Sequence, residues 1–153
     1  MLPVDDRLAL RELVEAYGLS VDALDVSWFS SLFTAAAVLV VHDAGGEVRR
    51  WEGDGIGEML AGVHRYLRTF HFVGNHAVRG EGDTVSGQTS CFAHHLRTVD
   101  DAGSPPARDR VVAIRYDDEY ARDATDGTWR FARRDVRILW RTLHDVEELG
   151  VAP

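Results

Sequence analysis

The spacing of apolar residues changes near residue 69, and this change constrains the fold more than any other feature of the sequence. Before residue 69, most apolar residues recur at three- and four-residue steps, as on the buried stripe of a helix. After it, apolar and polar residues alternate, as on strands with one buried face. Helices followed by antiparallel hairpins indicate an α+β domain, in which the helices pack against one face of a curved sheet.

The first part of the chain predicts three helices and two strands. The first helix is capped by Asp5 or Asp6 and carries an apolar stripe made of Leu8, Leu10, Leu13, Val14, Tyr17 and Val21. Further helices are expected at residues 26–33 and 56–67. A buried strand at 34–43 and a short return strand at 48–51 are expected on either side of the turn Ala44-Gly-Gly46.

The second part predicts a series of antiparallel strands. They are expected at residues 71–79, 85–99, 111–122 and 129–141, with a polar loop at 100–108. We expect one domain over residues 1–144 and an acidic, frayed tail over 145–153. A curved sheet that helices close at its narrow end leaves a concave pocket, where small-molecule sites tend to occur.

Composition excludes several classes of function. The formal net charge of −8 and the pI near 5.3 argue against a nucleic-acid partner, because phosphate binding needs a cationic face. No apolar run reaches membrane-spanning length, and the N-terminus lacks a charged-then-apolar signal pattern, so we expect a cytoplasmic protein with no membrane partner. A single cysteine, Cys91, excludes an internal disulfide and a Cys-rich zinc site.

The stretch Thr69-Phe-His-Phe-Val-Gly-Asn-His76 carries the main functional hypothesis. On a strand, His71, Val73 and Asn75 share one face, while Phe70 and Phe72 share the other. Imidazole is the only side chain whose unperturbed pKa allows proton exchange near neutral pH. We therefore expect His71 to line a pocket and to move a proton there.

No metal or cofactor is expected. His94 and His95 are adjacent on a predicted strand and point to opposite faces, so they cannot chelate one ion together. The glycines at 53–57 are too short a run, and wrongly placed, for a nucleotide-binding loop. The sequence also lacks a Gly-x-Ser-x-Gly elbow, and its chemistry is expected to be cofactor-free.

The order of elements resembles the nuclear-transport-factor-2-like superfamily, in particular its SnoaL-like branch of polyketide cyclases, dehydratases and isomerases. The resemblance covers about residues 5–142 and rests on loose motifs: Tyr17 with Asp22 and Asp25, Leu32-Phe33, Gly53 to Ile56, Thr69 to Asn75, Tyr116 to Tyr120, and Gly127-Thr-Trp-Arg-Phe131 with Arg134. It implies a cone-shaped, cystatin-like mixed or antiparallel sheet with the N-terminal helices on its concave side. It also implies a homo-oligomer, dimer or trimer, formed through the sheet.

The pocket residues resemble those of scytalone dehydratase and bile-acid 7α-dehydratase. Carried over by this resemblance, the catalytic positions are Tyr17, Asp22, His71 and Arg134. Where the bile-acid enzymes place a carboxylate, this sequence has His94-His95, which is closer to the second histidine of scytalone dehydratase. Alternation allows only one of the two to face inward, and we favour His94, which shares a face with Phe92 and Leu96. The residues expected to bind the substrate are Asn75, Phe33, Tyr116 and Trp28.

These residue types suit proton transfer next to a carbonyl group. A neutral imidazole can take a proton from carbon if a carboxylate fixes its tautomer, and Asp22 would do this for His71 or, alternatively, for His94. Tyr17 can donate a hydrogen bond to the developing oxyanion. Arg134 would pin Asp22 or meet an anionic substrate group, and Asn75 would hold a carbonyl oxygen.

Structural roles compete with these functional ones. Tyr17 lies on the apolar stripe of the first helix and could be a core residue. Asp22 and Asp25 could each cap the second helix, and Asp25 is better explained in this way. Arg134 shares a face with apolar residues, so it must be paired if it is buried.

Three functions remain. The first is a cofactor-independent dehydratase, isomerase or cyclase acting on a hydrophobic, polyketide- or steroid-like carbonyl compound. The second is a non-catalytic small-molecule-binding protein. The third is an assembly subunit resembling the β subunit of ring-hydroxylating dioxygenases. In such a subunit, side chains would fill the pocket. A hydrogen bond between His71 and Asp22 in an open cavity would favour the first.

Overall fold

Six strands form one curved sheet in the order β2-β1-β6-β5-β4-β3. The computed structural model describes residues 2–82, 84–99 and 106–150. The elements are α1 (Val4–Asp22), α2 (Val26–Ser31), β1 (Phe33–His42), β2 (Val48–Glu52), the 3-10 helix η1 (Gly53–Gly62), β3 (Arg68–Glu81), β4 (Thr84–Thr98), β5 (Ala107–Arg122) and β6 (Trp129–Val146). Neighbouring strands pair antiparallel except β1 and β6, which are parallel.

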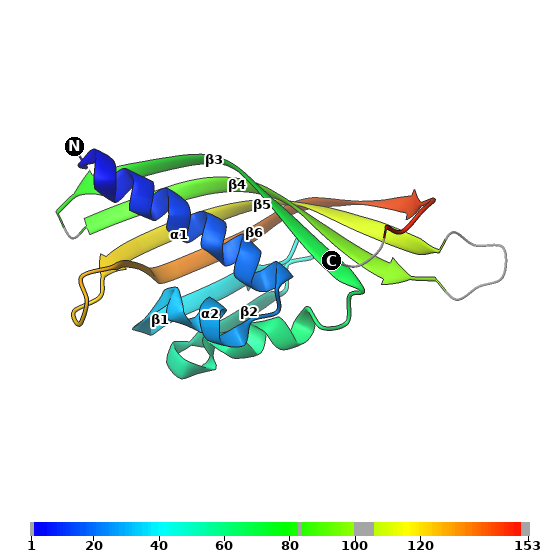
Figure 1. The fold of residues 1–153 in the computed structure, drawn as a ribbon, viewed down its shortest axis with the longest axis horizontal. Helices are drawn as coiled ribbons and strands as arrows, with labels where there is room; N and C mark the ends of the chain where they lie inside the picture. The colour runs from blue at the N-terminus through cyan, green and yellow to red at the C-terminus, as the bar shows by residue number, and fades with distance from the viewer. Residues whose placement is uncertain (1, 83, 100–105, 151–153) are drawn as a thin grey trace.

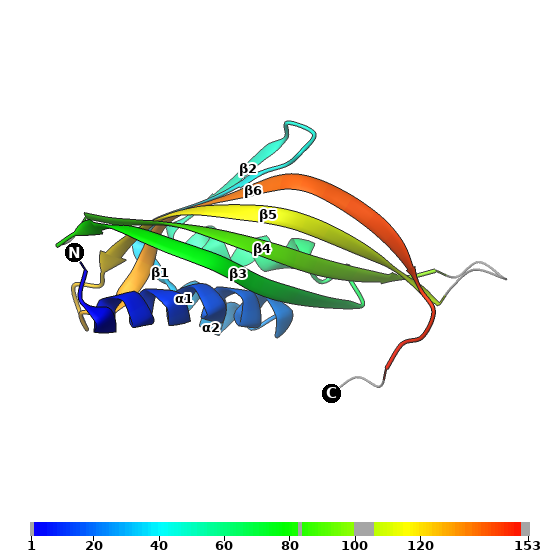
Figure 2. The same cartoon turned by 90° about the horizontal axis from the view of Figure 1, so that it is seen from above.

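The helices lie on the concave side of the sheet. In Figure 2 the long strands β3 to β6 arch over α1, and Figure 1 shows α1 running across them while α2 and η1 lie next to β1 and β2. This confirms the predicted α+β class, the curved mixed sheet and the position of the N-terminal helices. No helix in the described ranges could span a bilayer.

The core joins α1 to the sheet through aromatic rings. The Tyr17 ring lies 5.3 Å from Phe29, 5.5 Å from Tyr116 and 6.1 Å from Phe131, measured between centroids. Such tilted and edge-on pairs stabilise a core by about 0.5–1.5 kcal/mol beyond the area they bury. Leu10 and Val14, from the predicted stripe of α1, are fully buried in the same core.

Several element boundaries differ from the sequence-based expectations. Pro3, not Asp5 or Asp6, precedes α1, and the two aspartates lie in its first turn. The helix expected at 56–67 is the 3-10 helix at 53–62. Strand β6 runs to Val146, so the sheet extends two residues into the segment expected to be a tail. Residues 100–105 of the expected loop and 151–153 of the expected tail lie outside the described residues.

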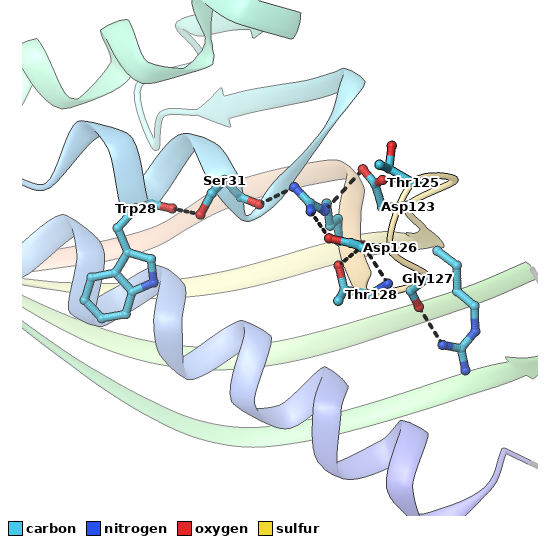
Figure 3. Close-up of polar contacts among 9 residues, drawn as sticks. Trp28, Ser31, Asp123, Thr125, Asp126, Gly127 and Thr128 are labelled. Carbon is cyan, nitrogen blue, oxygen red and sulfur yellow. Dashed lines mark hydrogen bonds and ion pairs between the residues drawn. The ribbon is translucent and has the colours of Figure 1, made fainter.

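The turn between β5 and β6 is fastened to α2. The Arg130 guanidinium donates to the backbone oxygen of Ser31 at 2.9 Å and to the Asp126 carboxylate at 2.7 Å. Thr128 donates to the same carboxylate through its hydroxyl at 2.6 Å (Figure 3). These contacts fix α2 and the start of β1 against this end of the sheet.

Candidate active site

A cavity of about 230 Å³ opens between the concave face of the sheet and the helices. Much of its wall is apolar, formed by Val21, Val41, Trp51, Met59, Val63, Val112, Ile114, Val136 and Ile138. Four polar side chains with rings interrupt this wall, namely Tyr17, His71, His95 and Tyr116. An apolar pocket with a few convergent polar groups is the usual form of a small-molecule site.

His71 is held by a carboxylate at the edge of this cavity. Asp22 Oδ1 lies 2.6 Å from His71 Nδ1 and accepts a hydrogen bond from the Thr69 hydroxyl at 2.8 Å. Burial alone would raise the pKa of Asp22, but the hydrogen bonds and charge of His71 bring that pKa below its ordinary value. An ionised carboxylate only accepts, so Nδ1 carries the proton and Nε2 is the basic nitrogen.

The local sequence brings acid and base together. Asp22 is the last residue of α1, so its side chain leaves the helix beside β3. A Cβ added at Gly18 would lie 3.1 Å from His71 Cβ, and glycine therefore allows the close approach of the helix to the strand. Arg11 donates to the backbone oxygen of Gly74 at 2.6 Å, which fastens α1 to β3 further along.

Two phenols face the cavity beside His71. Tyr17 and Tyr116 are almost fully buried, and their ring centroids lie 5.5 Å apart. Burial raises the pKa of Tyr17 to about 12, against the opposing effect of the Arg134 charge, and burial also raises the pKa of Tyr116. Both hydroxyls therefore stay protonated at neutral pH and can donate hydrogen bonds to an oxyanion.

The prediction that Arg134 meets Asp22 or the substrate is wrong. Arg134 is completely buried, does not line the cavity, and binds Asp118 through two hydrogen bonds of 2.7 and 2.8 Å. Its guanidinium carbon lies 4.1 Å from the ring centroid of Tyr17 and 4.3 Å from that of Tyr116. The Arg134 guanidinium therefore packs against both phenol rings, and it is paired with a carboxylate, as expected for a buried arginine.

The choice of His94 over His95 is also wrong. His95 lines the cavity, with its ring centroid 5.9 Å from that of His71. Burial lowers the pKa of His95 from 6.5 to about 4, and the electrostatic effect of the neighbouring His71 acts in the same direction. His94 points to the convex face, where its Nδ1 lies 2.5 Å from Asp109. The apolar neighbour used for the prediction, Phe92, lies on that convex face and is 47% exposed.

Some of the residues expected to bind the substrate line the cavity, and others do not. Tyr116 lines the cavity as predicted, while Phe33 is buried in the aromatic core and does not reach it. Asn75 is exposed, because a register shift between Val73 and His76 turns it away from the concave face.

Two residues near α2 also lie outside the cavity. Trp28 is 38% exposed on α2, and its backbone oxygen accepts the Ser31 hydroxyl at 2.7 Å (Figure 3). Asp25 caps α2 by accepting the Trp28 backbone N–H at 2.8 Å, as expected for a capping residue. In the described ranges, no three side chains of the metal-binding types converge on a common point.

A family model described as a SnoaL-like domain matches residues 3–135 of this sequence. The chain belongs to the SnoaL-like family. An uncharacterized protein of Mycobacterium bovis and one of Mycobacterium tuberculosis are 27% identical to this SnoaL-like chain over 139 residues, which cover 86% of it and 84% of each relative.

Solved structures share the fold of this SnoaL-like domain. A Novosphingobium aromaticivorans protein named an aromatic ring hydroxylase is 29% identical, with a TM-score of 0.75 and coverage of 95% of this chain and 96% of that one. Hexachlorocyclohexane dehydrochlorinase LinA-type3 of Novosphingobium barchaimii is 19% identical, with a TM-score of 0.74 and coverage of 98% and 96%. A Novosphingobium aromaticivorans protein named as a scytalone dehydratase is 19% identical, with a TM-score of 0.73 and coverage of 99% and 100%.

Sequence reasoning missed the charged mouth of the SnoaL-like cavity. Five charged residues border it, namely Asp43, Arg49, Arg65, Arg110 and Arg141. Asp43 accepts two hydrogen bonds from Arg141, at 2.8 and 2.7 Å. The sequence pattern could have identified Arg110 as a lining residue, because strand alternation places it on the same face as Val112, Ile114 and Tyr116.

Proposed function

We propose that this SnoaL-like protein is a cofactor-independent dehydratase, isomerase or cyclase that moves a proton next to a carbonyl group. The observation that supports this most strongly is the hydrogen bond between His71 and Asp22 at the wall of an open cavity. Together, the two residues form a base whose tautomer is fixed and whose cationic form is stabilised by a carboxylate.

In the proposed dehydration, His71 Nε2 takes the proton from the carbon next to the carbonyl. The electron pair of that C–H bond moves toward the carbonyl oxygen, where the hydroxyls of Tyr17 and Tyr116 donate to the enolate. The enolate then re-forms the carbonyl as the C–O bond to the β-hydroxyl breaks and a carbon–carbon double bond forms. The His71 imidazolium returns its proton to the departing hydroxide, so that one water leaves and the protein is unchanged.

The cavity limits the part of the substrate that it can enclose. Its volume of about 230 Å³ is below the 300–1,000 Å³ typical of sites that enclose drug-sized ligands. We therefore propose that it holds the reacting carbonyl portion of a polyketide- or steroid-like compound, while the remainder extends through the mouth.

The two alternative functions fit these observations less well. An assembly subunit needs no open pocket, whereas this chain has a cavity with two phenols and two imidazoles on its wall. A purely binding protein would gain nothing from a carboxylate that fixes the tautomer of a cavity histidine. The likeness to a dehydrochlorinase and to a protein named as a scytalone dehydratase supports the fold, and at 19% identity it supports no more.

Deuterium exchange tests the proposed proton transfer without knowledge of the natural substrate. β-Tetralone is a compact bicyclic ketone, and proton NMR in heavy water follows the loss of its α-hydrogens. We expect the wild type and His94→Ala to accelerate the exchange and His71→Ala to lose the acceleration. His94 is a matched control because it also pairs with a carboxylate, but on the convex face. Equal acceleration by His71→Ala would overturn the proposed role of His71.

We further propose that the protein self-associates through the convex face of the sheet. Four exposed aromatic residues lie there, namely Phe70, Phe72, Phe92 and Trp140. Strand pairing places Phe72 opposite Phe92, and the Phe92 and Trp140 rings lie 6.4 Å apart. Exposed apolar patches of this kind mark interfaces. Light scattering should find a dimer or trimer for the wild type and smaller particles for Phe72→Asp; a monomeric wild type would contradict this proposal.

A further inference from the structure

A second hollow continues from the active-site cavity toward the far ends of β4, β5 and β6. It has a volume of about 360 Å³ and shares His95 and Arg110 with the cavity. Its other lining residues are Arg97, Thr98, Val99, Arg108 and Leu143. In both ribbon views the three strands extend well past the C-terminal end of α1 (Figures 1 and 2), so α1 does not cover this part of the concave face.

Three arginines give the second hollow a positive charge. Antiparallel pairing places Arg97 directly opposite Arg108, and Arg110 directly opposite His95. Like charges that face each other across a strand pair destabilise the sheet. Of these three arginines, only Arg108 has a carboxylate within ion-pair distance in the described part of the chain, namely Asp145 at 3.2 Å.

An aromatic ring holds two guanidinium groups at the junction of the two hollows. Arg97 lies 4.9 Å and Arg65 5.2 Å from the ring centroid of Tyr66, and the His95 ring lies 4.7 Å from the same ring. Cation–π contacts position these arginines without neutralising them. The chain as a whole carries a net charge of −8, so a concave surface with this local excess of cations is suited to attracting an anion.

We propose that the second hollow binds an anionic group, a carboxylate or a phosphate, carried by the same substrate whose carbonyl portion occupies the cavity. The assignment to a substrate rests on the proposed function above. Arginine binds both kinds of oxyanion through paired, charge-assisted hydrogen bonds. Because Arg110 and His95 line both hollows, one ligand can span them.

The acidic residues that follow β6 in the described part of the chain leave the hollow open. Glu147 and Glu148 follow β6 and are both exposed. Within the described ranges, the ion pairs of the hollow are limited to the Arg108–Asp145 contact at its rim. No carboxylate of residues 2–82, 84–99 or 106–150 pairs with Arg97 or Arg110, so among these residues both guanidinium groups can accept an anion from outside the chain.

Calorimetric titration with three ligands of one shape tests the proposal. Phenylbutyrate, phenylbutyl phosphate and neutral phenylbutanol share a ring for the cavity and a chain of equal length. We expect at least one anion to bind about 10- to 100-fold more tightly than the alcohol, as for hydrogen bonds to charged groups. The stronger of the two anions identifies the group that the hollow prefers. High salt should reduce this preference.

Arginine variants test whether the preference for anions comes from the second hollow. Arg97→Gln and Arg110→Gln should each lower anion affinity toward that of the alcohol, whereas Arg79→Gln, on the convex face, should keep the wild-type preference. Equal binding of all three ligands, or an unchanged preference in both variants, would overturn the proposal. Calorimetry requires no turnover, so a failure here is distinct from a failure of the His71-dependent exchange. Melting curves of both variants show whether they fold.

Discussion

Asp22 receives two hydrogen bonds from a single residue, His71. Its Oδ1 lies 2.6 Å from the ring Nδ1, and its Oδ2 accepts the backbone N–H at 2.8 Å. The carboxylate therefore fixes both the ring and the strand position from which the ring projects. This double contact joins the end of α1 to β3 and orients His71, the residue proposed to accept the proton in the cavity.

Loss of the Asp22 charge should impair proton transfer while leaving the fold in place. Asp22→Asn keeps the shape of the side chain but removes the charge that stabilises the His71 imidazolium. We expect tetralone exchange to slow by about 10²-fold or more, the scale of general acid–base catalysis. Asp109→Asn removes the matched partner of His94 on the convex face and should leave the rate unchanged. Equal rates for the two variants would argue against the role of Asp22.

Substitutions at Tyr17 and Tyr120 should separate an effect on the exchange rate from an effect on the free energy of unfolding. Tyr17→Phe removes a cavity hydroxyl and should slow exchange by about 10²–10³-fold, as for a lost oxyanion donor, with little change in melting. Tyr120 lies outside the cavity, and its hydroxyl donates to Asp118 at 3.0 Å. Tyr120→Phe should therefore lower the free energy of unfolding by about 1–3 kcal/mol and leave the exchange rate intact. A destabilised Tyr17→Phe with normal exchange would show that the Tyr17 hydroxyl is structural.

The buried ion pair between Arg134 and Asp118 should affect the free energy of unfolding far more than an exposed pair does. Arg134→Met leaves the Asp118 carboxylate buried without its partner, which typically costs about 3–5 kcal/mol of unfolding free energy. The exposed pair of Arg50 and Glu52 is the control, and Arg50→Met should change that free energy by no more than about 1 kcal/mol. Denaturant titrations measure both. Similar midpoints for Arg134→Met and the wild type would contradict the importance of the buried pair.

His95 should make stability depend on pH. Its pKa is about 4 in the folded protein and ordinarily 6.5, so between these values the unfolded chain binds more protons than the folded one. The contribution of His95 to the free energy of unfolding is therefore fully present above pH 6.5 and is lost as the pH falls toward 4. His95→Gln should show a shallower loss of stability over this range. Identical pH profiles would mean that His95 is not buried as described.

The sequence predicted the class of fold, which depends on local patterns, and the contact between Asp22 and His71. Helical and alternating spacing placed the elements, and the resemblance to the SnoaL-like dehydratases, carried by Tyr17, Asp22 and His71, pointed to the pocket. The contact of Asp22 with His71 required only that the end of α1 meet the start of β3. Gly18 makes that approach possible.

The predictions that were wrong concern the direction or the partner of a side chain, which strand register and three-dimensional packing determine. The irregular pairing after Val73 turns Asn75 outward, and a one-residue shift of this kind leaves little trace in residue types. The inward face of β4 could not be chosen from hydrophobicity, because the convex face carries exposed aromatic residues such as Phe92. The partner of Arg134 is on β5, and strand order alone determines that Asp118 and not Asp22 meets it.

The most direct test of the account is the ring opening of nitrobenzisoxazole. In this reaction a base removes the proton from carbon while the N–O bond breaks, and the coloured cyanonitrophenolate forms without any other reactant. The wild type and His94→Ala should catalyse the reaction at equal rates, and His71→Ala should fall to the rate of buffer. Wild-type activity in His71→Ala would contradict the claim that His71 is the base of this cavity.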